Sequence, residues 1–405
     1  MKLETQCLHA GYQPESTTNS CAVPVYKTSS YVFNDTEHAA NLFGLRELGN
    51  IYTRLMNPTT DVLEQRVTAL DGGAAALGLA SGTSGVFYSI INIAQEGDEI
   101  VSANNLYGGT YTQFNDILPK FGIKVNFVDP NDPANYAAAI TDKTKALFCE
   151  TVSNPGLDVA DLEAIAKIAD DHGIPLIVDS TFSTPYLTQP IRHGASIVIH
   201  SLTKWLGGHG NGIGGVVVDS GSFNWKNGNF PLYDEPDNSY HGLRWGHDLP
   251  EPLAPLAFIL RMRTVPLRNL GACISPDNSW QFIQGIETLS LRMERHCENA
   301  LAVAKHLQGH ESVEWVRFPG LEGDPMYDLN QKYLRGKGGS MVVFGIKGGA
   351  EAGPKFIDKL ELFSHLANVG DAKSLAIHPA TTTHSQLNEE QQLAGGIKPE
   401  LVRLS

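Results

Sequence analysis

Short apolar runs alternate with helix-like segments through the middle of the chain. The runs are rich in β-branched residues, and a polar residue or glycine follows each one. Such runs predict buried strands, and strands that alternate with helices predict a mostly parallel sheet with helices on both faces. We therefore expect an α/β fold. The strand-like runs are AAALGLASG, EIVSANNLY, KVNFVD, KALFCETVS, PLIVDSTFS, SIVIHSLTK and GIGGVVVD.

The pattern changes on either side of this region, which divides the chain into three parts. Residues 1–60 are polar and turn-rich, with VPVYKTSSYVFND as the only strand-like run, and predict an arm that contacts a neighbouring subunit. Residues 61–268 form the central α/β domain, including an irregular excursion at 220–265 that is rich in aromatic residues, proline and glycine. Residues 269–405 predict a smaller α/β domain, in which one helical stretch ending at Gly309 precedes the strands VEWVRF and GSMVVFGI.

Composition and charge narrow the class of function. The net charge is -14 and no run of lysine and arginine occurs, which disfavours binding to nucleic acid or to an anionic membrane. No apolar run is long enough for a membrane span or a signal peptide. The five cysteines are scattered without a CxxC spacing, so we expect no disulfide framework and no metal site. These features favour small-molecule chemistry in a reducing cytoplasm.

Two polar residues at neighbouring strand ends are the first candidates for chemistry. In HSLTKWLGGHGNG, Lys204 lies in the turn between the strand-like runs 197–199 and 216–218. Asp179 follows the apolar run before it. Ligands of mostly parallel sheets bind beyond the carboxyl ends of the strands, so we expect Asp179 and Lys204 to be neighbours.

This combination matches the needs of pyridoxal phosphate. The cofactor requires a lysine for a Schiff base, a carboxylate that keeps the pyridine nitrogen protonated, and donors for its phosphate. Ser201 and Thr203 flank the lysine, and SGTSG at 81–85 places small residues at a strand-to-helix junction that can bind an anion. An isolated loop lysine is usually a solvated surface charge, and an aspartate after a strand is often a helix cap, but the joint occurrence favours the cofactor. GNGIGG at 210–215 matches a dinucleotide fingerprint, but it precedes a strand instead of opening a helix.

Several long segments, in the same order, resemble the Cys/Met-metabolism family of pyridoxal-phosphate enzymes. This family includes cystathionine synthases and lyases, methionine γ-lyase and O-acetylhomoserine sulfhydrylases. The resemblance covers nearly the whole chain and implies the fold-type I transferase architecture, with 61–268 as the cofactor-binding domain. The segments are SLTKWLGGHG, YTRLMNPTTDVLEQRVTALDGG, LYGGTY, ETVSNPGLDVADL, HPATTTHSQL and LVRLS.

The resemblance implies roles for residues around the cofactor. Tyr52 and Arg54 would reach the phosphate bound by a neighbouring subunit, which suits the bidentate geometry of arginine. Gly82 and Thr83 would give the phosphate backbone N–H groups, and Tyr107 would stack on the pyridine ring.

Other residues are implied on the substrate side of the site. Asn154 would lie near the phenolic oxygen of the cofactor, and Arg403 would bind the α-carboxylate of the amino acid. Asn368 and Thr383 would complete the substrate site. Lys204, Tyr107 and Asp179 would form the catalytic set.

Departures from the family pattern favour one branch. Methionine γ-lyases carry cysteine two positions after the stacking tyrosine, where this chain has Gly109, and lyases usually have serine at the position of Asn368. The long excursion also resembles the sulfhydrylases. The implied reaction is γ-replacement in methionine biosynthesis, in which O-acetyl-L-homoserine and sulfide give L-homocysteine and acetate. The implied assembly is a homotetramer built from dimers with shared active sites. Additional activity on O-acetylserine stays open. Three alternative functions also stay open: a methionine γ-lyase, a cystathionine γ-synthase or lyase, and a non-catalytic cofactor-binding or regulatory protein.

Overall fold

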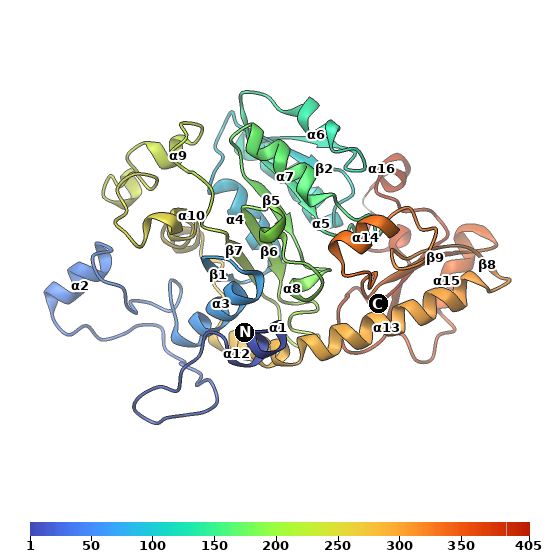
Figure 1. The fold of residues 1–405 in the computed structure, drawn as a ribbon, viewed down its shortest axis with the longest axis horizontal. Coiled ribbons are helices and arrows are strands. Elements are labelled where there is room, and N and C mark those ends of the chain that lie inside the picture. Colours follow the sequence, from blue (N-terminus) through green and yellow to red (C-terminus); the bar gives the residue numbers. More distant parts are fainter. Residues whose placement is uncertain (386) are drawn as a thin grey trace.

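A computed structural model describes residues 1–385 and 387–405, and it contains two α/β lobes (Figure 1). The larger lobe is built on a seven-stranded sheet of order β1-β7-β6-β5-β4-β2-β3. Within it β7 is the strand that runs antiparallel to its neighbours, and the other pairs are parallel. The mostly parallel sheet is therefore confirmed. Its strands are β1 (Ala75–Leu79), β2 (Glu99–Ala103), β3 (Lys124–Val128), β4 (Thr144–Glu150), β5 (Leu176–Asp179), β6 (Ile197–Ser201) and β7 (Gly215–Asp219).

Helices bury the central strands, as their apolar sequences require. Helix α4 (Gly82–Ile91) packs on β6 and β7, and α7 (Leu162–Asp171) packs on β4 and β5. Strands β4 and β7 are buried at every residue. The remaining helices of this lobe are α3 (Pro58–Asp71), α5 (Gly108–Thr112), α6 (Ala134–Ala139) and α8 (Thr184–Leu187).

The N-terminal region differs from the sequence prediction. The run at 23–35 forms no strand within the described residues and contributes only an isolated bridge, between Ser30 and Tyr52. Its backbone pairs with side chains at the start of α3: Tyr26 N donates to Thr59 Oγ1 at 3.0 Å, and Asn57 Nδ2 donates to Tyr26 O at 2.9 Å. Two unexpected helices, α1 (Leu3–His9) and α2 (Thr36–Phe43), also form. Because α1 packs on α3, part of the predicted arm belongs to the core of its own chain.

The excursion at 220–265 is irregular, as expected, but it has a packed interior. Trp225 stacks on Tyr233 with ring centroids 4.5 Å apart and on Phe258 at 5.4 Å. Aromatic burial of this kind holds an irregular segment in one conformation. The segment contains α9 (Pro231–Asp234) and α10 (Ala257–Met262), and it ends in the π-helical turn Arg263–Leu267, which leads to α11 (Arg268–Leu270).

The helical stretch before Gly309 is divided into two helices. It breaks at Thr288, between α12 (Pro276–Glu287) and α13 (Leu289–Gln308). Arg292 Nη2 donates to Gly285 O at 2.6 Å, so a side chain satisfies a carbonyl at the end of α12. The sequence pattern did not predict this break.

The smaller lobe contains a five-stranded sheet of order β10-β11-β12-β9-β8, along which α13 runs (Figure 1). The two predicted strands are confirmed as β8 (Val313–Arg317) and β9 (Val342–Ile346). Three more were not foreseen: β10 (Ser364–His365), β11 (Leu375–Ile377) and β12 (Leu401–Leu404). All three are short, so their apolar periodicity is weak. The lobe also holds α14 (Tyr327–Tyr333), α15 (Ala352–Ile357) and α16 (Glu389–Ala394).

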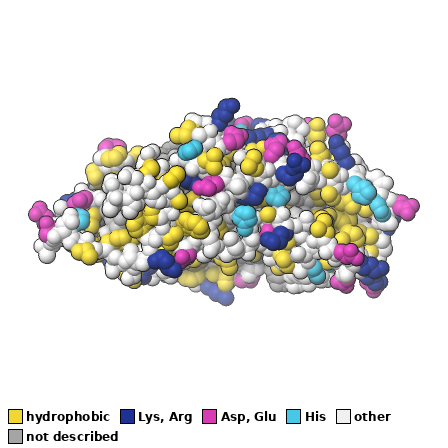
Figure 2. Space-filling view, turned by 90° about the horizontal axis from the view of Figure 1, so that it is seen from below, with side chains coloured by type: hydrophobic (Ala, Val, Ile, Leu, Met, Phe, Trp, Pro, Cys, Tyr) yellow, Lys and Arg dark blue, Asp and Glu magenta, His cyan; other side chains and the backbone are white. Residues whose placement is uncertain are grey.

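Among the described residues, none of the helices combines the length and apolar character needed to cross a bilayer. Acidic and basic side chains are interspersed over the face shown in Figure 2.

Candidate active site

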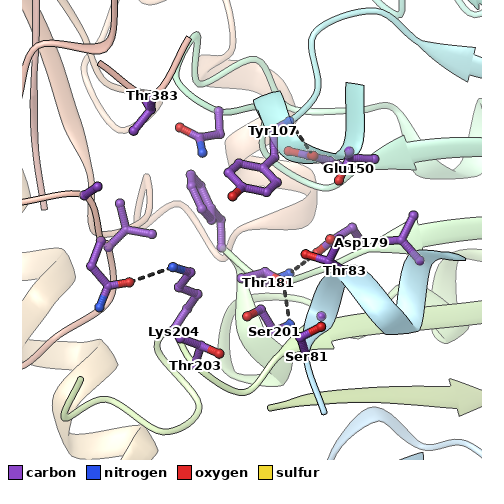
Figure 3. A pocket seen from close by; sticks show the side chains of 18 of the residues that line it. Ser81, Thr83, Tyr107, Glu150, Asp179, Thr181, Ser201, Thr203, Lys204 and Thr383 are labelled. Carbon is purple, nitrogen blue, oxygen red and sulfur yellow. Dashed lines mark hydrogen bonds between the residues drawn. The ribbon is translucent and has the colours of Figure 1, made fainter. Parts of the chain in front are cut away.

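A cavity of about 360 Å³ lies beyond the carboxyl ends of the central strands. Figure 3 shows side chains from the sheet, from α4 and from the smaller lobe that converge on it. Eleven of the thirteen predicted site residues line this cavity, which agrees with the rule for ligands of such sheets. They are Gly82, Thr83, Tyr107, Asn154, Asp179, Ser201, Thr203, Lys204, Asn368, Thr383 and Arg403.

Lys204 is the basic group of the larger lobe at this cavity. Its Nζ donates a hydrogen bond to Asn368 Oδ1 at 2.6 Å, across the boundary between the lobes. Burial, and to a smaller extent the nearby Arg403 guanidinium, lower the pKa of the amine to about 8. A sizeable fraction of the amine is therefore neutral at mildly alkaline pH, as a nucleophile or proton acceptor must be.

Contacts with α12 and α13 hold the loop that carries Lys204 in place. Arg292 Nη1 donates to Trp205 O at 2.7 Å, and the guanidinium also reaches the end of α12. The loop and helix touch through glycines, because a Cβ on Gly285 would lie 2.1 Å from Gly207 O. The lysine thus projects from a rigid loop.

Asp179 ends β5 and is held in place by the next residues. Its Oδ1 accepts a hydrogen bond from Thr181 N at 2.9 Å, and Thr181 Oγ1 accepts one from Ser201 N at 2.8 Å (Figure 3). Burial raises the pKa of the carboxyl group, whereas the Thr181 hydrogen bonds and the charge of His200 oppose this shift. The residue is thus a buried carboxyl group with an ordered geometry.

Glu150 is a second carboxyl group in the cavity, and the sequence analysis missed it. It ends β4 beside Asp179 in the strand register, and its Oε1 accepts a hydrogen bond from Tyr107 N at 2.7 Å. Burial and the neighbouring Asp179 raise its pKa well above the usual range, so this environment favours the neutral form of the carboxyl group. The rule that selected Asp179, a polar residue directly after a buried strand, also selects Glu150.

Arg403 and Asn154 form the opposite side of the cavity. Arg403 on β12 is buried; its Nη1 donates to Asn154 Oδ1 at 2.9 Å and its Nη2 donates to Asn368 O at 3.2 Å. Burial lowers the pKa of the guanidinium to about 10, so it keeps its positive charge at neutral pH. A fixed cation in this position can bind a carboxylate.

The first turn of α4 provides an anion site. Ser81 caps the helix by accepting from Ser84 N at 3.0 Å, and the N–H groups of the first helical residues have no acceptors within the helix. Gly82 brings this turn close to β6, since a Cβ there would lie 2.8 Å from Ser201 Cβ. The Thr203 hydroxyl lines the same cavity and also accepts from Gly214 N at 3.1 Å. A phosphate fits this set of donors.

The ring of Tyr107 borders the cavity and is 44% exposed. It folds over Gly109, where a Cβ would lie 2.5 Å from Tyr107 Cε1. A larger side chain at Gly109, such as the cysteine of methionine γ-lyases, would therefore displace the Tyr107 ring.

Tyr52 and Arg54 do not line the cavity of their own chain. Arg54 lies over the Tyr52 ring at 5.3 Å, and its Nη1 donates to Arg268 O at 3.2 Å. The side chain of Tyr52 is exposed. The structure thus separates these two residues from the other predicted site residues.

A lysine of lowered pKa, a buried carboxyl group and an anion site, all beyond the carboxyl edge of a mostly parallel sheet, define the class of pyridoxal-phosphate-dependent enzymes. The model of the family described as "Cys/Met metabolism PLP-dependent enzyme" matches residues 4–405, and the chain belongs to this family.

Named relatives are similar over nearly their whole length. The chain is 57% identical to the O-acetyl-L-homoserine sulfhydrylase of Leptospira meyeri, covering 100% of this chain and 92% of the relative. It is 52% identical to O-acetyl-L-homoserine sulfhydrylase 1 of Thermus thermophilus, covering 100% and 96%. A crystal structure from Campylobacter jejuni, named as an O-acetylhomoserine (thiol)-lyase with a pyridoxyl-lysine monophosphate at its position 205, superposes with a TM-score of 0.96 at 40% identity, covering 100% and 96%.

Proposed function

We propose that the chain catalyses the replacement of the acetate of O-acetyl-L-homoserine by sulfide, which yields L-homocysteine and acetate. The observation that carries the proposal is the contact of Lys204 Nζ with Asn368 Oδ1 in the Arg403-lined cavity, in a chain whose full-length relatives are named for this reaction. Asn368 is the residue at which the sequence departs from the lyase pattern. In this structure it contacts the reactive amine.

The residues present fit pyridoxal phosphate. Gly82, Thr83, Ser201 and Thr203 would hold its phosphate, and Lys204 would bind it covalently. When bound, the cofactor withdraws electrons from the carbons next to the substrate amine. The remaining contacts would come from Asp179 at the ring nitrogen, Tyr107 at the ring face and Asn154 at the phenolic oxygen.

The side chains of the site have separate roles in substrate binding and proton transfer. Arg403 binds the α-carboxylate of the substrate and orients it, and Asn368 holds Lys204 Nζ close to the substrate. The neutral Nζ accepts the α-proton and afterwards moves a β-proton, because one flexible amine can reach both neighbouring carbons. Acetate leaves from the γ-carbon and sulfide takes its place.

We also propose that the active assembly is a homotetramer of dimers with shared sites. Tyr52 and Arg54 lie outside the cavity of their own chain, and Tyr52 is 40% exposed, which supports a role at a neighbouring subunit's phosphate. The five free cysteines support a reducing cytoplasm as the location.

A side-by-side turnover assay tests the reaction. O-acetylhomoserine, O-succinylhomoserine, O-acetylserine and methionine are each supplied with and without sulfide, and products are measured. Homocysteine formed fastest from O-acetylhomoserine, and only with sulfide, is the expected result. Release of methanethiol from methionine as the main activity would identify a methionine γ-lyase, and lack of turnover with every substrate would favour a binding protein.

A further inference from the structure

A buried imidazole lies on the strand beside Asp179, one residue beyond its register partner. His200 on β6 follows Ile199, the register partner of Asp179 on β5. Its Nδ1 is 3.1 Å from Ser180 O, and its Nε2 is 2.8 Å from Oδ2 of Asp71, the last residue of α3. The side chains of His200 and Asp71 are both 0% exposed. Neither residue lines the cavity.

The hydrogen-bond partners determine the charge of His200. A carbonyl and a carboxylate oxygen can only accept hydrogen bonds, so both ring nitrogens of His200 must donate. A neutral imidazole has a single N–H and would leave a lone pair facing an acceptor. With Asp71 as a carboxylate, this geometry favours an imidazolium. Burial lowers the pKa of His200, but Asp71, Asp179 and the Ser180 carbonyl together raise it above its ordinary value.

The stability of the fold does not by itself explain the buried pair of His200 and Asp71. Desolvation of two charges generally offsets their attraction, so an apolar pair of the same volume would serve the core as well. Asp71 Oδ1 finds no hydrogen-bond partner in the described part of the chain, which leaves His200 as the group that compensates its charge. On the other neighbouring strand, burial and Asp179 raise the pKa of Glu150, which favours its neutral form. The charge of His200, on the adjacent strand, opposes the effect of burial on the pKa of Asp179.

We propose that His200, held as an imidazolium by Asp71, is a positioning residue that keeps Asp179 ionised inside the protein, so that Asp179 can hold the cofactor's ring nitrogen protonated. The inference rests on the proposed function of Asp179. It deepens that function, because burial raises the pKa of Asp179 and a cation nearby opposes this shift.

The test uses holoenzyme reconstituted with cofactor labelled with ¹⁵N at the ring nitrogen, whose chemical shift reports protonation. The key variant is the double substitution His200→Gln with Asp71→Asn, which removes both charges and keeps an amide pair of similar shape. Asp179→Asn is the positive control. His193→Gln is the matched negative control, since His193 Nδ1 pairs with Glu163 Oε1 at 2.9 Å outside the cavity.

We expect the ¹⁵N signal of the double variant and of Asp179→Asn to move towards the unprotonated position, with no change in His193→Gln. The kcat for O-acetylhomoserine should fall about tenfold, as one pKa unit at the ring nitrogen implies, with little change in KM. A shift in Asp179→Asn without one in the double variant overturns the inference and leaves the proposed function intact. No shift in Asp179→Asn overturns the role of Asp179 and the inference with it.

A second measurement needs no substitution, in case the double variant does not fold. In wild-type holoenzyme with ¹⁵N-labelled histidine, His200 should show protons on both ring nitrogens at neutral pH. An unprotonated ring nitrogen at His200 would exclude the imidazolium and so overturn the proposal.

Discussion

Lys204 combines two properties that ordinary surface lysines lack, a lowered pKa and a fixed partner for its amine. Lys204→Ala should give a folded protein whose turnover is lower by several orders of magnitude, because covalent attachment and proton transfer are lost together. Turnover of O-acetylhomoserine and the visible absorbance of bound cofactor measure the two losses. Lys167→Ala, which removes only an exposed pair with Asp171, is the control. Substantial activity in Lys204→Ala would contradict the assignment.

The pH dependence of cofactor binding follows from the same residue. Only the neutral amine reacts with an aldehyde, and the pKa of Lys204 is lowered to about 8. The rate of cofactor uptake by the apoprotein should therefore rise with pH up to about 8 and level off above it, well below the range of an ordinary lysine. Stopped-flow absorbance measures this profile.

Arg403 offers a check on the cause of that shift. Arg403→Gln removes the positive charge that adds to the effect of burial, so the midpoint of the uptake profile should move to higher pH. An unchanged midpoint would mean that the guanidinium has no influence on the amine. The same variant should raise KM for O-acetylhomoserine more than it lowers kcat, because the carboxylate contact is present before the chemistry starts.

At the scale of elements, the first turn of α4 and strand β6 form the anion site by close approach. Gly82→Ala would place a Cβ 3.0 Å from the backbone Cα of Ser201, so the helix must move away from the strand. We expect cofactor affinity to fall by the equivalent of one hydrogen bond to a charged group, about 1.5 to 3 kcal/mol. Titration of the apoprotein with cofactor measures this loss. Gly309→Ala is the control, because a Cβ there meets only His306 O at 3.9 Å.

The elements that the sequence predicted well are those whose apolar runs are buried on both faces. Strands β4 to β7 are of this kind, and their ends gave Asp179 and Lys204 by topology alone. The break at Thr288 was not predicted, because it depends on the contact of Arg292 with a distant loop. The strand predicted within residues 23–35 does not form for a similar reason, since the backbone of this segment is hydrogen-bonded to side chains at the start of α3. Periodicity records burial, and it does not record which distant group satisfies a backbone atom.

At the scale of the whole molecule, the cavity draws residues from both lobes. Its charge pattern was only partly visible in the sequence. His200 and Asp71 are 129 residues apart, and no spacing rule connects two residues so far apart in the chain. Thr383, Asn368 and Arg403 came from the resemblance to a family, because the strands of the smaller lobe are too short to predict where they meet the larger one.

The proposed sharing of sites between subunits gives a prediction at this scale. Arg54→Ala should weaken cofactor binding by about 1.5 to 3 kcal/mol, although under this proposal Arg54 comes from a different subunit than the Lys204 that it supports. At a cofactor concentration too low to load the Arg54→Ala protein, mixing it with the inactive Lys204→Ala protein should restore activity after subunit exchange. In a mixed dimer, one site carries both lesions and the other carries none. Mixed dimers that assemble but stay inactive would exclude a shared site.

Strand β7 runs against its neighbours, so the loop with Lys204 leaves and re-enters the sheet at the same edge. A parallel β7 would require a long crossover instead. In mechanical terms both ends of the loop are fixed, because β6 and β7 are paired from Ile197 with Asp219 to Ser201 with Gly215. A force on the amine is therefore shared by two central strands. The long side chain of the lysine, and not the loop that carries it, is the moving part.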